Sequence, residues 1–495
     1  MGTVNWLVLL VTHPLEFRTL IQFWMYHEQK RDIKSIKEHP TSGWDRESMR
    51  RCWEFLDMTS RSFSAVIKEL DGDLARTIAL FYLVLRGLDT IEDDMTIPDN
   101  VKQPLLRAFH EHTVTPGWKF TGSGPDEKDR QLLIEYDTVV EEVNRLTPQY
   151  KNIIIDITLK METGMADYAH KAATTGSIYL ETIAEYDLYC HYVAGLVGEG
   201  LSRIFSASGK EVPSLGSQLE LSNSMGLLLQ KTNIIRDFRE DSEEKRYFWP
   251  REIWGQYGFT EMHEMHPTDE DTVRRATYAQ SGMVLDALRH AIDSLDYLKM
   301  LRNQSVFTFC AIPATMAIAT LELCFMNKQM FQRNIKIRKA NAAQLIMRST
   351  NPREVGLIFR EYARKIHAKA IPSDPNFVKI SVACGKIEAW CEHNYPSFIG
   401  YQAETGKQTM NQDDPRARVI QAETERDAQR AKDLKVEQIR RNIAKGTAPA
   451  DALENSEAKQ INQTEIMMYV VAAFVVVCGG TVAFVLAVIK YTESS

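Results

Sequence analysis

Three carboxylates in the stretch LLQKTNIIRDFREDSEEKRYFW, residues 228–249, have a spacing that could do chemistry. Asp237, Glu240 and Asp241 stand at positions i, i+3 and i+4, so on a helix all three share one face. Three acids on one face repel each other unless a cation lies between them. The spacing therefore indicates either a metal-binding face or an ordinary solvated helix face.

A second set with the same D-x-x-E-D order lies about 150 residues earlier, in LDTIEDD (88–94). It consists of Asp89, Glu92 and Asp93. Two such sets on separate helices of one apolar-rich domain can face each other across a cavity and hold divalent cations such as Mg²⁺ through oxygen ligands. Either set alone is compatible with a solvated helix face, but the repeated order favours a paired metal site.

Arginines near both acidic sets indicate the kind of substrate. The four are Arg61 in SRSF, Arg86 one helical turn before the first set, Arg236 directly before the second set, and Arg246 in KRYFW. A single arginine on a helix is usually a surface residue. Arginines beside carboxylates that hold Mg²⁺ suit a polyanion, above all a diphosphate, because the guanidinium group binds phosphate oxygens in pairs. The metal would stabilise the charge on the leaving diphosphate.

A departing diphosphate leaves a carbocation, which needs weakly nucleophilic walls that exclude water. Core packing is an equally good interpretation for most of the candidate wall residues, which are Phe63, Phe81, Tyr82, Leu85, Leu227, Leu228, Leu229, Phe307 and Phe309. Tyr189, in DLYCHY (187–192), is a candidate proton acceptor or cation stabiliser. A tyrosine with a pKa near its usual value of about 10 needs neighbouring positive charge to act as a base.

The elements that must position these residues are helices. Apolar residues recur at three-and-four spacing over 46–69, 74–95, 129–146, 152–172, 185–206, 218–242, 273–301, 313–327 and 352–370. Proline and glycine interrupt the pattern between these segments, and no series of alternating strands is present. The sequence predicts an all-α fold with one catalytic domain over residues 35–375.

Composition narrows the class of protein. The chain has 495 residues, 44% of them hydrophobic, and a net charge of −7, which argues against nucleic acid as a partner. Its seven cysteines are scattered without a C-x-x-C pair. They therefore indicate neither a disulfide framework nor a zinc site, and they favour a reducing compartment.

The C-terminal region predicts a membrane anchor. Residues 467–489 are 23 consecutive residues without a charged side chain, and only six residues follow them. As a helix they would rise about 35 Å, enough to cross a hydrocarbon core. Ten Lys or Arg lie between 416 and 459 but only Lys490 lies beyond the span, so the positive-inside rule keeps the large N-terminal part in the cytosol. A buried core helix is the alternative.

The domain boundaries follow from these changes in composition. Residues 413–445 are rich in charge and poor in large apolar side chains, which is typical of a solvated helix or a flexible tether. We expect an N-terminal segment (1–34), the catalytic domain (35–375), its C-terminal extension (376–401), a charged linker (402–465), the transmembrane anchor (466–490) and a lumenal tail (491–495).

Two further motifs do not point to chemistry. Residues 195–200 read GLVGEG within a helical pattern and with no strand before them, so they are not a dinucleotide fingerprint. Their small residues more plausibly allow helices or substrate to approach closely. His263 and His266 in HEMH match no metal-binding pattern.

Several long motifs resemble the squalene synthases of fungal type, which are farnesyl-diphosphate farnesyltransferases. They are DTIED, SRSF, YCHYVAGLVGEGLSR, SMGLLLQKTNIIRDFRED, YFWP and RNQSVFTFCAIPATMA, within residues 35–375. The resemblance implies an all-α isoprenoid-synthase bundle around a central cavity. It also implies Mg²⁺-dependent condensation of two farnesyl diphosphates to presqualene diphosphate, followed by NADPH-dependent rearrangement to squalene, in sterol (ergosterol) biosynthesis. Together with the tail, it implies the endoplasmic reticulum membrane.

The resemblance also implies binding roles for particular residues. The first Mg²⁺ site would be Asp89, Glu92 and Asp93, and the second Asp237 and Asp241. The contacts to the substrate diphosphate or the cofactor phosphate would be Arg61, Arg86 and Arg236, with Arg246 and Tyr82 as further diphosphate contacts. Lys336 and Arg338 in KIRK would bind NADPH, whose 2′-phosphate suits a basic pair, although by themselves they are a plain solvated charge run.

The catalytic roles implied are equally specific. Tyr189 would take the proton in the first half-reaction, and Phe309, in FCAIP, would stabilise the cation of the second. Arg86, Asp93, Asp237 and Asp241 would act on the diphosphate through the metal sites.

Three other functions remain open from the sequence. A phytoene or dehydrosqualene synthase shares both acidic sets but uses no NADPH, and the segments around Phe309 and Lys336 favour squalene. A chain-elongating prenyltransferase normally shows a D-D-x-x-D order, which residues 89–93 do not. A tail-anchored helical scaffold accounts for residues 413–445 but has no need of two matched acidic sets. Oligomeric state and protein partners are not indicated.

Overall fold

The computed structural model describes residues 9–10, 12–26, 32–60, 63–266, 269–401, 408–411, 413–444 and 449. The chain divides into two compact units, residues 1–395 and residues 396–495. The first unit carries the predicted site residues. Arg61 and the predicted anchor at 467–489 lie outside the described residues.

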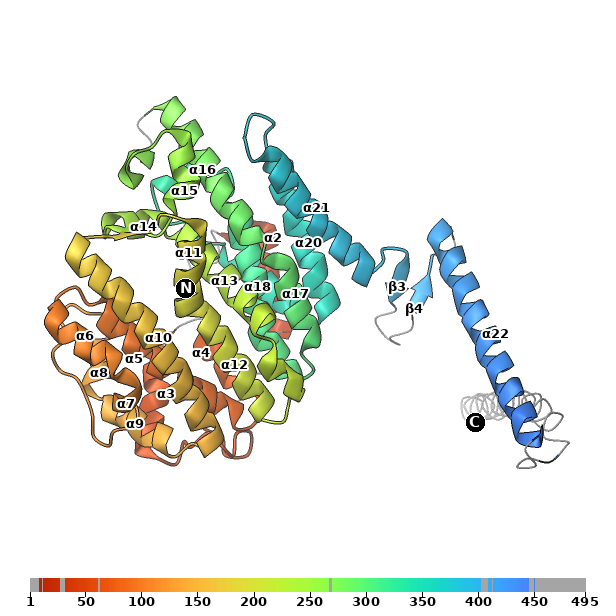
Figure 1. Ribbon diagram of the computed structural model, residues 1–495, viewed down its shortest axis with the longest axis horizontal. Helices are drawn as coiled ribbons and strands as arrows, with labels where there is room; N and C mark the ends of the chain where they lie inside the picture. Colours follow the sequence, from red (N-terminus) through yellow and green to blue (C-terminus); the bar gives the residue numbers. More distant parts are fainter. Residues whose placement is uncertain are drawn as a thin grey trace, which may run out of the picture. The chain divides into compact units, whose positions relative to one another are not determined.

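The first unit is built almost entirely from helices, which confirms the predicted all-α class (Figure 1). Its longer helices are α2 (Pro14–Tyr26), α3 (Glu47–Thr59), α5 (Leu74–Asp93), α6 (Asp99–Arg107), α9 (Tyr136–Asn144), α10 (Pro148–Thr175), α11 (Ile183–Cys190), α12 (Leu196–Ala207), α13 (Leu219–Arg236), α16 (Glu270–Leu288), α17 (Ala291–Met300), α18 (Gln304–Cys324), α19 (Lys339–Arg348), α20 (Pro352–Lys369) and α21 (Phe377–Asn394).

Shorter elements connect these helices. They are α4 (Phe63–Lys68), α7 (Phe109–His112), α8 (Arg130–Ile134), the π-helix η1 (His191–Gly195), the 3₁₀-helix η2 (Pro213–Ser217), α14 (Phe238–Glu243), α15 (Arg251–Trp254), and the 3₁₀-helices η3 (Gly255–Tyr257), η4 (Met262–Met265) and η5 (Lys328–Phe331). The only strands described in this unit are β1 (Ile178–Tyr179) and β2 (Arg246–Tyr247), which pair in parallel.

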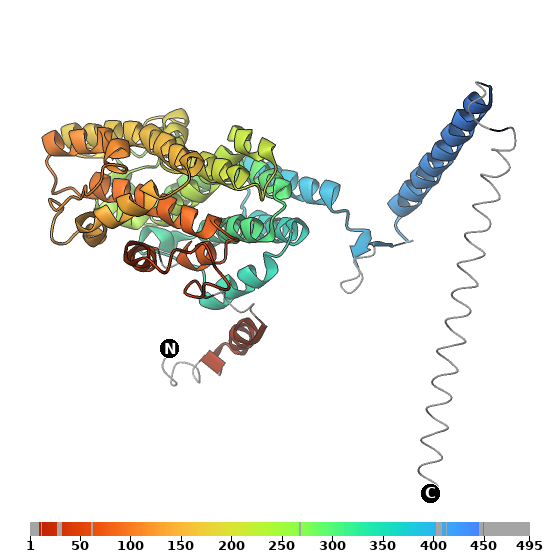
Figure 2. The ribbon, with the colours of Figure 1, turned by 90° about the horizontal axis from the view of Figure 1, so that it is seen from below.

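A group of neighbouring helices forms the core of the unit. α13 packs against α12, α17 and α18, and α10 packs against α5, α6 and α12, as Figures 1 and 2 show. α5 is apolar around most of its circumference, with 14 of its 20 residues buried, as expected of a helix enclosed by others. Each large apolar side chain buried in this way contributes about 1.5–3 kcal/mol.

α18 begins earlier than the sequence pattern predicts. A helix was expected over 313–327 with proline at its start, but the helix runs from Gln304 to Cys324 with Pro313 in its interior. Asn303 caps its N-terminus by accepting hydrogen bonds from the backbone N–H groups of Ser305 and Val306. Proline therefore marks no boundary here; it removes a hydrogen-bond donor at a position that lines the central cavity.

Other predicted helices are interrupted. The segment 273–301 forms α16 and α17, separated at residues 289–290, and the segment 218–242 divides into α13 and α14 at Asp237. The apolar periodicity continues across both breaks, which is why spacing alone does not reveal them.

The glycine-rich stretch 195–200 lets helices approach closely, as expected. A Cβ added at Gly198 would lie 2.4 Å from the carbonyl oxygen of Ser222 on α13. One added at Gly200 would lie 2.5 Å from the ring of Phe81 on α5. Glycine therefore allows α12 to contact both α5, which carries the first acidic set, and α13, which leads into the second.

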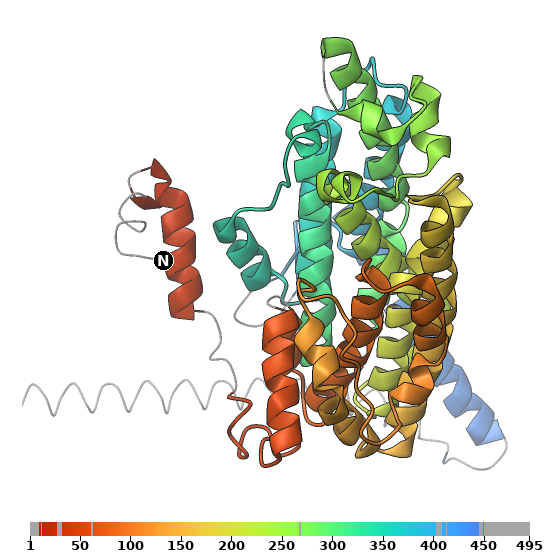
Figure 3. The same ribbon diagram turned by 90° about the vertical axis from the view of Figure 1, so that its left-hand side faces the viewer.

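Among the described residues, one helix is long and apolar enough to cross a membrane, namely α18. Most of this helix is buried inside the first unit, so it is a core helix. The N-terminal helix α2 packs against α19, and Figure 3 shows the two side by side.

The second unit contains a short antiparallel pair and a long helix. β3 (Ile399–Tyr401) pairs with β4 (Gln408–Met410), and α22 spans Pro415–Ala444. Most side chains of α22 are exposed, and its mixed charges include an ion pair between Arg441 and Glu437 one turn apart.

Candidate active site

Both acidic sets line one cavity of about 1260 Å³ in the first unit. Asp89, Glu92 and Asp93 reach it from the C-terminal end of α5, and Asp237, Glu240 and Asp241 reach it from the junction of α13 and α14. The two sets are 148 residues apart in the chain (237 − 89), so the fold brings them together. The cavity continues between α5, α10, α12, α13 and α18.

The first acidic set is compact and electrostatically unfavourable without a cation. Asp89, Glu92 and Asp93 each offer an oxygen within 4.8 Å of the others, the one such group of potential metal ligands among the described residues. Burial and the neighbouring charge of Asp93 raise the pKa of Asp89 to about 7, although Arg86 opposes the shift. Burial and the other two carboxylates raise the pKa of Glu92 well above its usual value. Clustered carboxylates of this kind are suited to a hard divalent cation.

Arg86 lies beside the first set. Its Nη1 is 2.8 Å from Asp89, and its Nη2 donates to the hydroxyl of Tyr82 at 3.2 Å. Its Nε is 3.8 Å from Asp129 and has no hydrogen-bond partner. This buried donor is available to an anion entering the cavity.

The second set spans a break in the helix. Asp237 ends α13 and precedes α14, yet the N–H of Asp241 still donates to the carbonyl of Asp237 at 3.0 Å, so the helical spacing of the carboxylates is kept. Arg236 binds the carboxylate of Asp237 through both Nε and Nη2. Burial raises the pKa of Asp241 to about 7, and Arg246 opposes this shift.

Arg246 connects the two acidic sets. Its Nη1 is 3.0 Å from Asp93, and its Nη2 is 3.1 Å from Asp241 and 2.8 Å from Glu244. The residue before it, Lys245, has a φ of 59°, a left-handed conformation that is strained for a residue with a side chain. A single guanidinium therefore bridges the two acidic sets.

Tyr189 faces the cavity from α11 and is buried. Its ring stacks on Phe248 at 4.8 Å and meets Tyr168 edge to face at 5.0 Å. Burial, together with the carboxylates of Glu92 and Asp93, raises the pKa of Tyr189 well above 10. The sequence argument required positive charge beside this hydroxyl, whereas the strongest neighbouring charges are negative, so Tyr189 is protonated at neutral pH.

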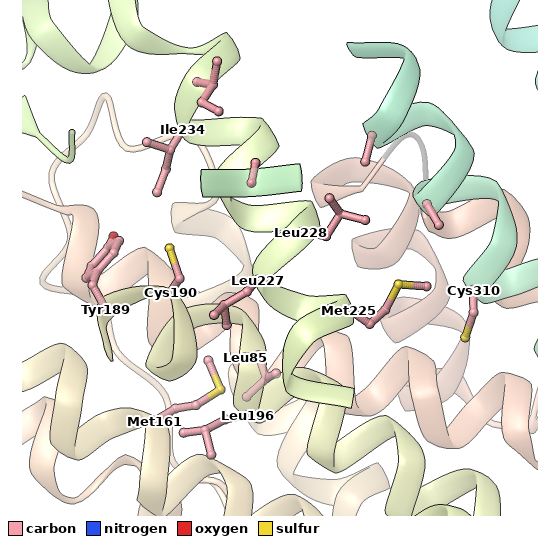
Figure 4. Close-up of a cluster of buried hydrophobic side chains, with 14 of the residues drawn as sticks. Leu85, Met161, Tyr189, Cys190, Leu196, Met225, Leu227, Leu228, Ile234 and Cys310 are labelled. Atoms are coloured by element: carbon pink, nitrogen blue, oxygen red, sulfur yellow. The ribbon is translucent and has the colours of Figure 1, made fainter. Parts of the chain in front are cut away.

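Apolar side chains form the rest of the cavity. Figure 4 shows Tyr189 in the cluster of buried hydrophobic side chains that also contains Leu85, Met161, Leu196 and Leu227. Of the predicted wall residues, those that line the cavity are Phe63, Phe81, Tyr82, Leu85, Leu229 and Phe309. The others, Leu227, Leu228 and Phe307, pack in the surrounding core.

The predicted cofactor residues lie outside the cavity lining. Lys336 and Arg338 are exposed on the segment before α19, and Arg338 pairs with Glu16 of α2 at 2.5 Å. The same segment is tied to the second acidic set, because the amide of Asn334 donates to Glu240 at 2.6 Å. Lys336 is thus two residues from a direct contact with the cavity rim.

Sequence reasoning missed polar residues that shape the rim. Lys102 is buried and donates to the carbonyl of Glu92 at 2.7 Å. Asp94 accepts from the N–H of Gly124 at 2.9 Å and so fixes the loop that covers the first set. Asp94 is the fourth acid in the run DTIEDD (89–94), which was a usable signal. Nothing in the sequence marks Lys102.

The histidines of the HEMH stretch lie close to α14. His263 lies in η4, and His266 contacts Arg239 at 3.0 Å and Ser242 at 3.1 Å, both on α14. His266 therefore packs against the short helix of the second acidic set.

Known proteins are similar to this chain in sequence and in fold. The family model of squalene/phytoene synthases matches residues 56–341. The squalene synthase of Ganoderma lucidum is 62% identical over 456 residues, covering 90% of this chain and 97% of that protein. The squalene synthase of Mycosarcoma maydis is 49% identical, covering 94% and 83%. The solved complex of TcSQS with the ligand E5700 is 40% identical, with a TM-score of 0.66, and covers 70% of this chain and 99% of that one.

Proposed function

The chain belongs to the squalene/phytoene synthase family, as a squalene synthase with farnesyl-diphosphate farnesyltransferase activity, and we propose that its reaction occurs in the cavity described above. There, two farnesyl diphosphates condense head to head to presqualene diphosphate in the presence of Mg²⁺. Squalene would then form from this intermediate by reductive rearrangement, with NADPH as the source of hydride. The observation that carries the proposal is that two acidic sets line one cavity whose remaining walls are mostly apolar.

The acidic sets fit magnesium. Asp89, Glu92 and Asp93 offer clustered oxygens, and Asp237 and Asp241 offer a second group across the same cavity. Held by these carboxylates, Mg²⁺ would supply positive charge that stabilises the leaving diphosphate.

The arginines orient the diphosphate. Arg86 presents a buried Nε without a hydrogen-bond partner, and Arg246 lies between the sets with its Nε also buried and without a hydrogen-bond partner. Tyr82 donates to the carbonyl of Thr59 and accepts from Arg86, so it fixes that guanidinium. Arg236 holds Asp237, and Arg61 is proposed as a further phosphate contact on sequence grounds alone.

Tyr189 and the apolar walls control the fate of the cation. Because Tyr189 is protonated, it can take a substrate proton only by passing its own hydroxyl proton to an acceptor such as a diphosphate oxygen. Phe309, buried against Phe205 at 6.1 Å, presents an aromatic ring to the cavity and can stabilise the cation of the second half-reaction.

The second half-reaction needs a reductant at the rim. Bound NADPH would supply the hydride. We assign its 2′-phosphate to Lys336 and Arg338, because the hydrogen bond from Asn334 to Glu240 holds their segment beside the second acidic set. Arg338 would exchange its pairing with Glu16 for the phosphate.

The test is product analysis with the full chain in detergent. With farnesyl diphosphate, Mg²⁺ and NADPH we expect squalene; without NADPH, presqualene diphosphate should accumulate. A product unaffected by NADPH would instead identify a phytoene or dehydrosqualene type of synthase. Asp93→Asn should abolish most turnover, whereas a scaffold protein would be indifferent.

The cellular location is part of the proposal. The uncharged span 467–489 anchors the chain in the endoplasmic reticulum membrane, with the catalytic unit in the cytosol. Squalene is a hydrocarbon that water does not carry, so an anchored enzyme can release it into lipid. Removal of residues 460–495 should move the chain from the membrane to the soluble fraction; unchanged membrane association would contradict the assignment.

A further inference from the structure

Lys231 is a fully buried lysine on α13, six residues before Asp237. Its neighbours Gln230 and Asn233 line the cavity, but Lys231 does not. It lies instead on the side of α13 that packs against α11 and α16. A buried ammonium group on a helix of the active site is costly unless its partners are fixed.

The partners of Lys231 come from both neighbouring helices. Its Nζ is 2.5 Å from Asp187 on α11 and 2.5 Å from Asp286 on α16. Arg289 also contacts Asp187 and lies 2.8 Å from Asp286, so two cations share two carboxylates. The two cations differ in position, because Lys231 is inaccessible to solvent whereas the side chain of Arg289 is 45% exposed.

An aromatic ring and a neutral imidazole complete the surroundings of the ammonium group. Its Nζ lies over the ring of Tyr186 at 4.8 Å. The nearby imidazole of His290 is neutral, because burial and then the charges of Lys231 and Arg289 lower its pKa to about 3. The network therefore joins α11, α13 and α16 through one buried cation.

The position of Asp187 connects this network to Tyr189. Two residues on a helix are separated by about 200°, so Asp187 and Tyr189 point to nearly opposite sides of α11. Drawing Asp187 toward Lys231 therefore turns Tyr189 toward the cavity, where its ring packs between Phe248 and Tyr168.

We propose that Lys231 is a positioning residue for the first half-reaction, holding α11 so that the hydroxyl of Tyr189 stands at the reacting carbons. This inference rests on the role assigned to Tyr189 in the proposed function. Without Lys231, Arg289 still neutralises both carboxylates but from the solvent side, so the fold survives while α11 turns outward.

The experiment measures the two half-reactions separately, with the full chain in detergent and Mg²⁺. The first is presqualene diphosphate formation from farnesyl diphosphate without NADPH. The second is squalene formation from supplied presqualene diphosphate with NADPH. Lys231→Met should lower kcat of the first by about 10- to 100-fold, because small misplacements of a reacting group are costly. The second should stay within about threefold of the unchanged protein.

Two further variants keep the test decisive. Lys231→Arg retains the charge and should also lower kcat of the first half-reaction selectively, but by a smaller factor. This variant supplies the test if Lys231→Met does not fold. Tyr189→Phe should lose the first half-reaction, and adding Lys231→Met to it should cause little further loss, because both changes act on one group.

Glu142 supplies a matched control. Its side chain is fully buried and bound by Arg46 at 2.7 Å and Ser48 at 2.7 Å, but it does not line the cavity. Glu142→Gln should lower the melting temperature and leave the ratio of the two half-reactions unchanged.

The outcomes separate the inference from the proposed function. If Lys231→Met or Lys231→Arg lowers both half-reactions equally, as a general loss of stability would, or leaves the first unchanged, the inference is overturned. If Tyr189→Phe retains the first half-reaction, the role of Tyr189 fails and the inference fails with it. If Tyr189→Phe is selective and the Lys231 variants are not, only the inference fails.

Discussion

The two acidic sets have the same D-x-x-E-D order but different local structures. The first ends the continuous helix α5, and its three carboxylates lie together. The second spans a break at Asp237, where α13 ends and α14 begins. The same spacing therefore occurs at the end of one continuous helix and across the junction between two helices.

Their electrostatic states also differ. In the first set Glu92 has no arginine partner, and its pKa is raised by burial and the two neighbouring carboxylates. In the second, Arg236 binds Asp237 and Arg246 binds Asp241. Each set has two carboxylates that pair with arginines, so the difference lies in the third: Glu92 is crowded by Asp89 and Asp93, whereas Glu240 is exposed and accepts from Asn334 at 2.6 Å. We infer that the first set binds metal more strongly in the absence of substrate.

The largest expected effect comes from Glu92→Gln. Removing one of three repelling charges should raise the melting temperature of the metal-free protein by about 2–4 °C, since about 1 kcal/mol shifts it by that much. Squalene formation should fall roughly 100- to 1,000-fold, because the proposed metal site loses a carboxylate ligand. The charge that develops on the leaving diphosphate is then less well stabilised. Thermal unfolding in EDTA and in Mg²⁺, together with product formation, measures both effects.

Asp237→Asn is the matching change in the second set. It removes the acceptor of Arg236, so it should lower the melting temperature of the metal-free protein while also lowering turnover. Equal changes in melting temperature for Glu92→Gln and Asp237→Asn in EDTA would contradict the electrostatic difference between the two sets.

The sequence predicts which residues form the site better than it predicts their contacts and burial. The carboxylates, the helices that carry them and the tyrosine follow from spacing and motif, because helical periodicity fixes which side chains share a face. The bridge made by Arg246 does not, because it depends on a contact between residues 153 apart in the chain. The break at Asp237 does not either, because the apolar periodicity continues across it. For the same reason Lys231 reads from the sequence as a surface lysine, and its burial appears only when α11 and α16 are in place.

A smaller effect is expected from Arg246→Met, which removes the cation shared by the sets. Asp93 and Asp241 would lose a charged hydrogen bond, worth about 1.5–3 kcal/mol for each group, so the metal-free protein should melt lower. The KM for farnesyl diphosphate should rise about tenfold. Mg²⁺ should restore most of the melting temperature, because a divalent cation replaces the lost charge.

Arg239 gives the control for this change. It lies on α14, seven residues before Arg246, pairs with Glu243 at 2.5 Å and does not line the cavity. Arg239→Met should change neither KM nor the response to Mg²⁺. A loss of stability in Arg246→Met that Mg²⁺ does not restore would show that Arg246 and the metal do not exchange.

The smallest effect is the pH dependence expected at Asp241 of the second set. The side chain of Asp241 is 11% exposed, and burial raises its pKa to about 7, above the value of about 4 in the unfolded chain. The folded, metal-free protein therefore binds this proton more strongly than the unfolded chain does. Its contribution to stability is complete below pH 4 and is lost as the pH rises toward 7. In EDTA, Asp241→Asn should gain about 2–4 °C over the unchanged protein between pH 5 and pH 8. A constant difference across this range would mean that Arg246 already holds Asp241 ionised, and the two sets would then differ even more than the contacts indicate.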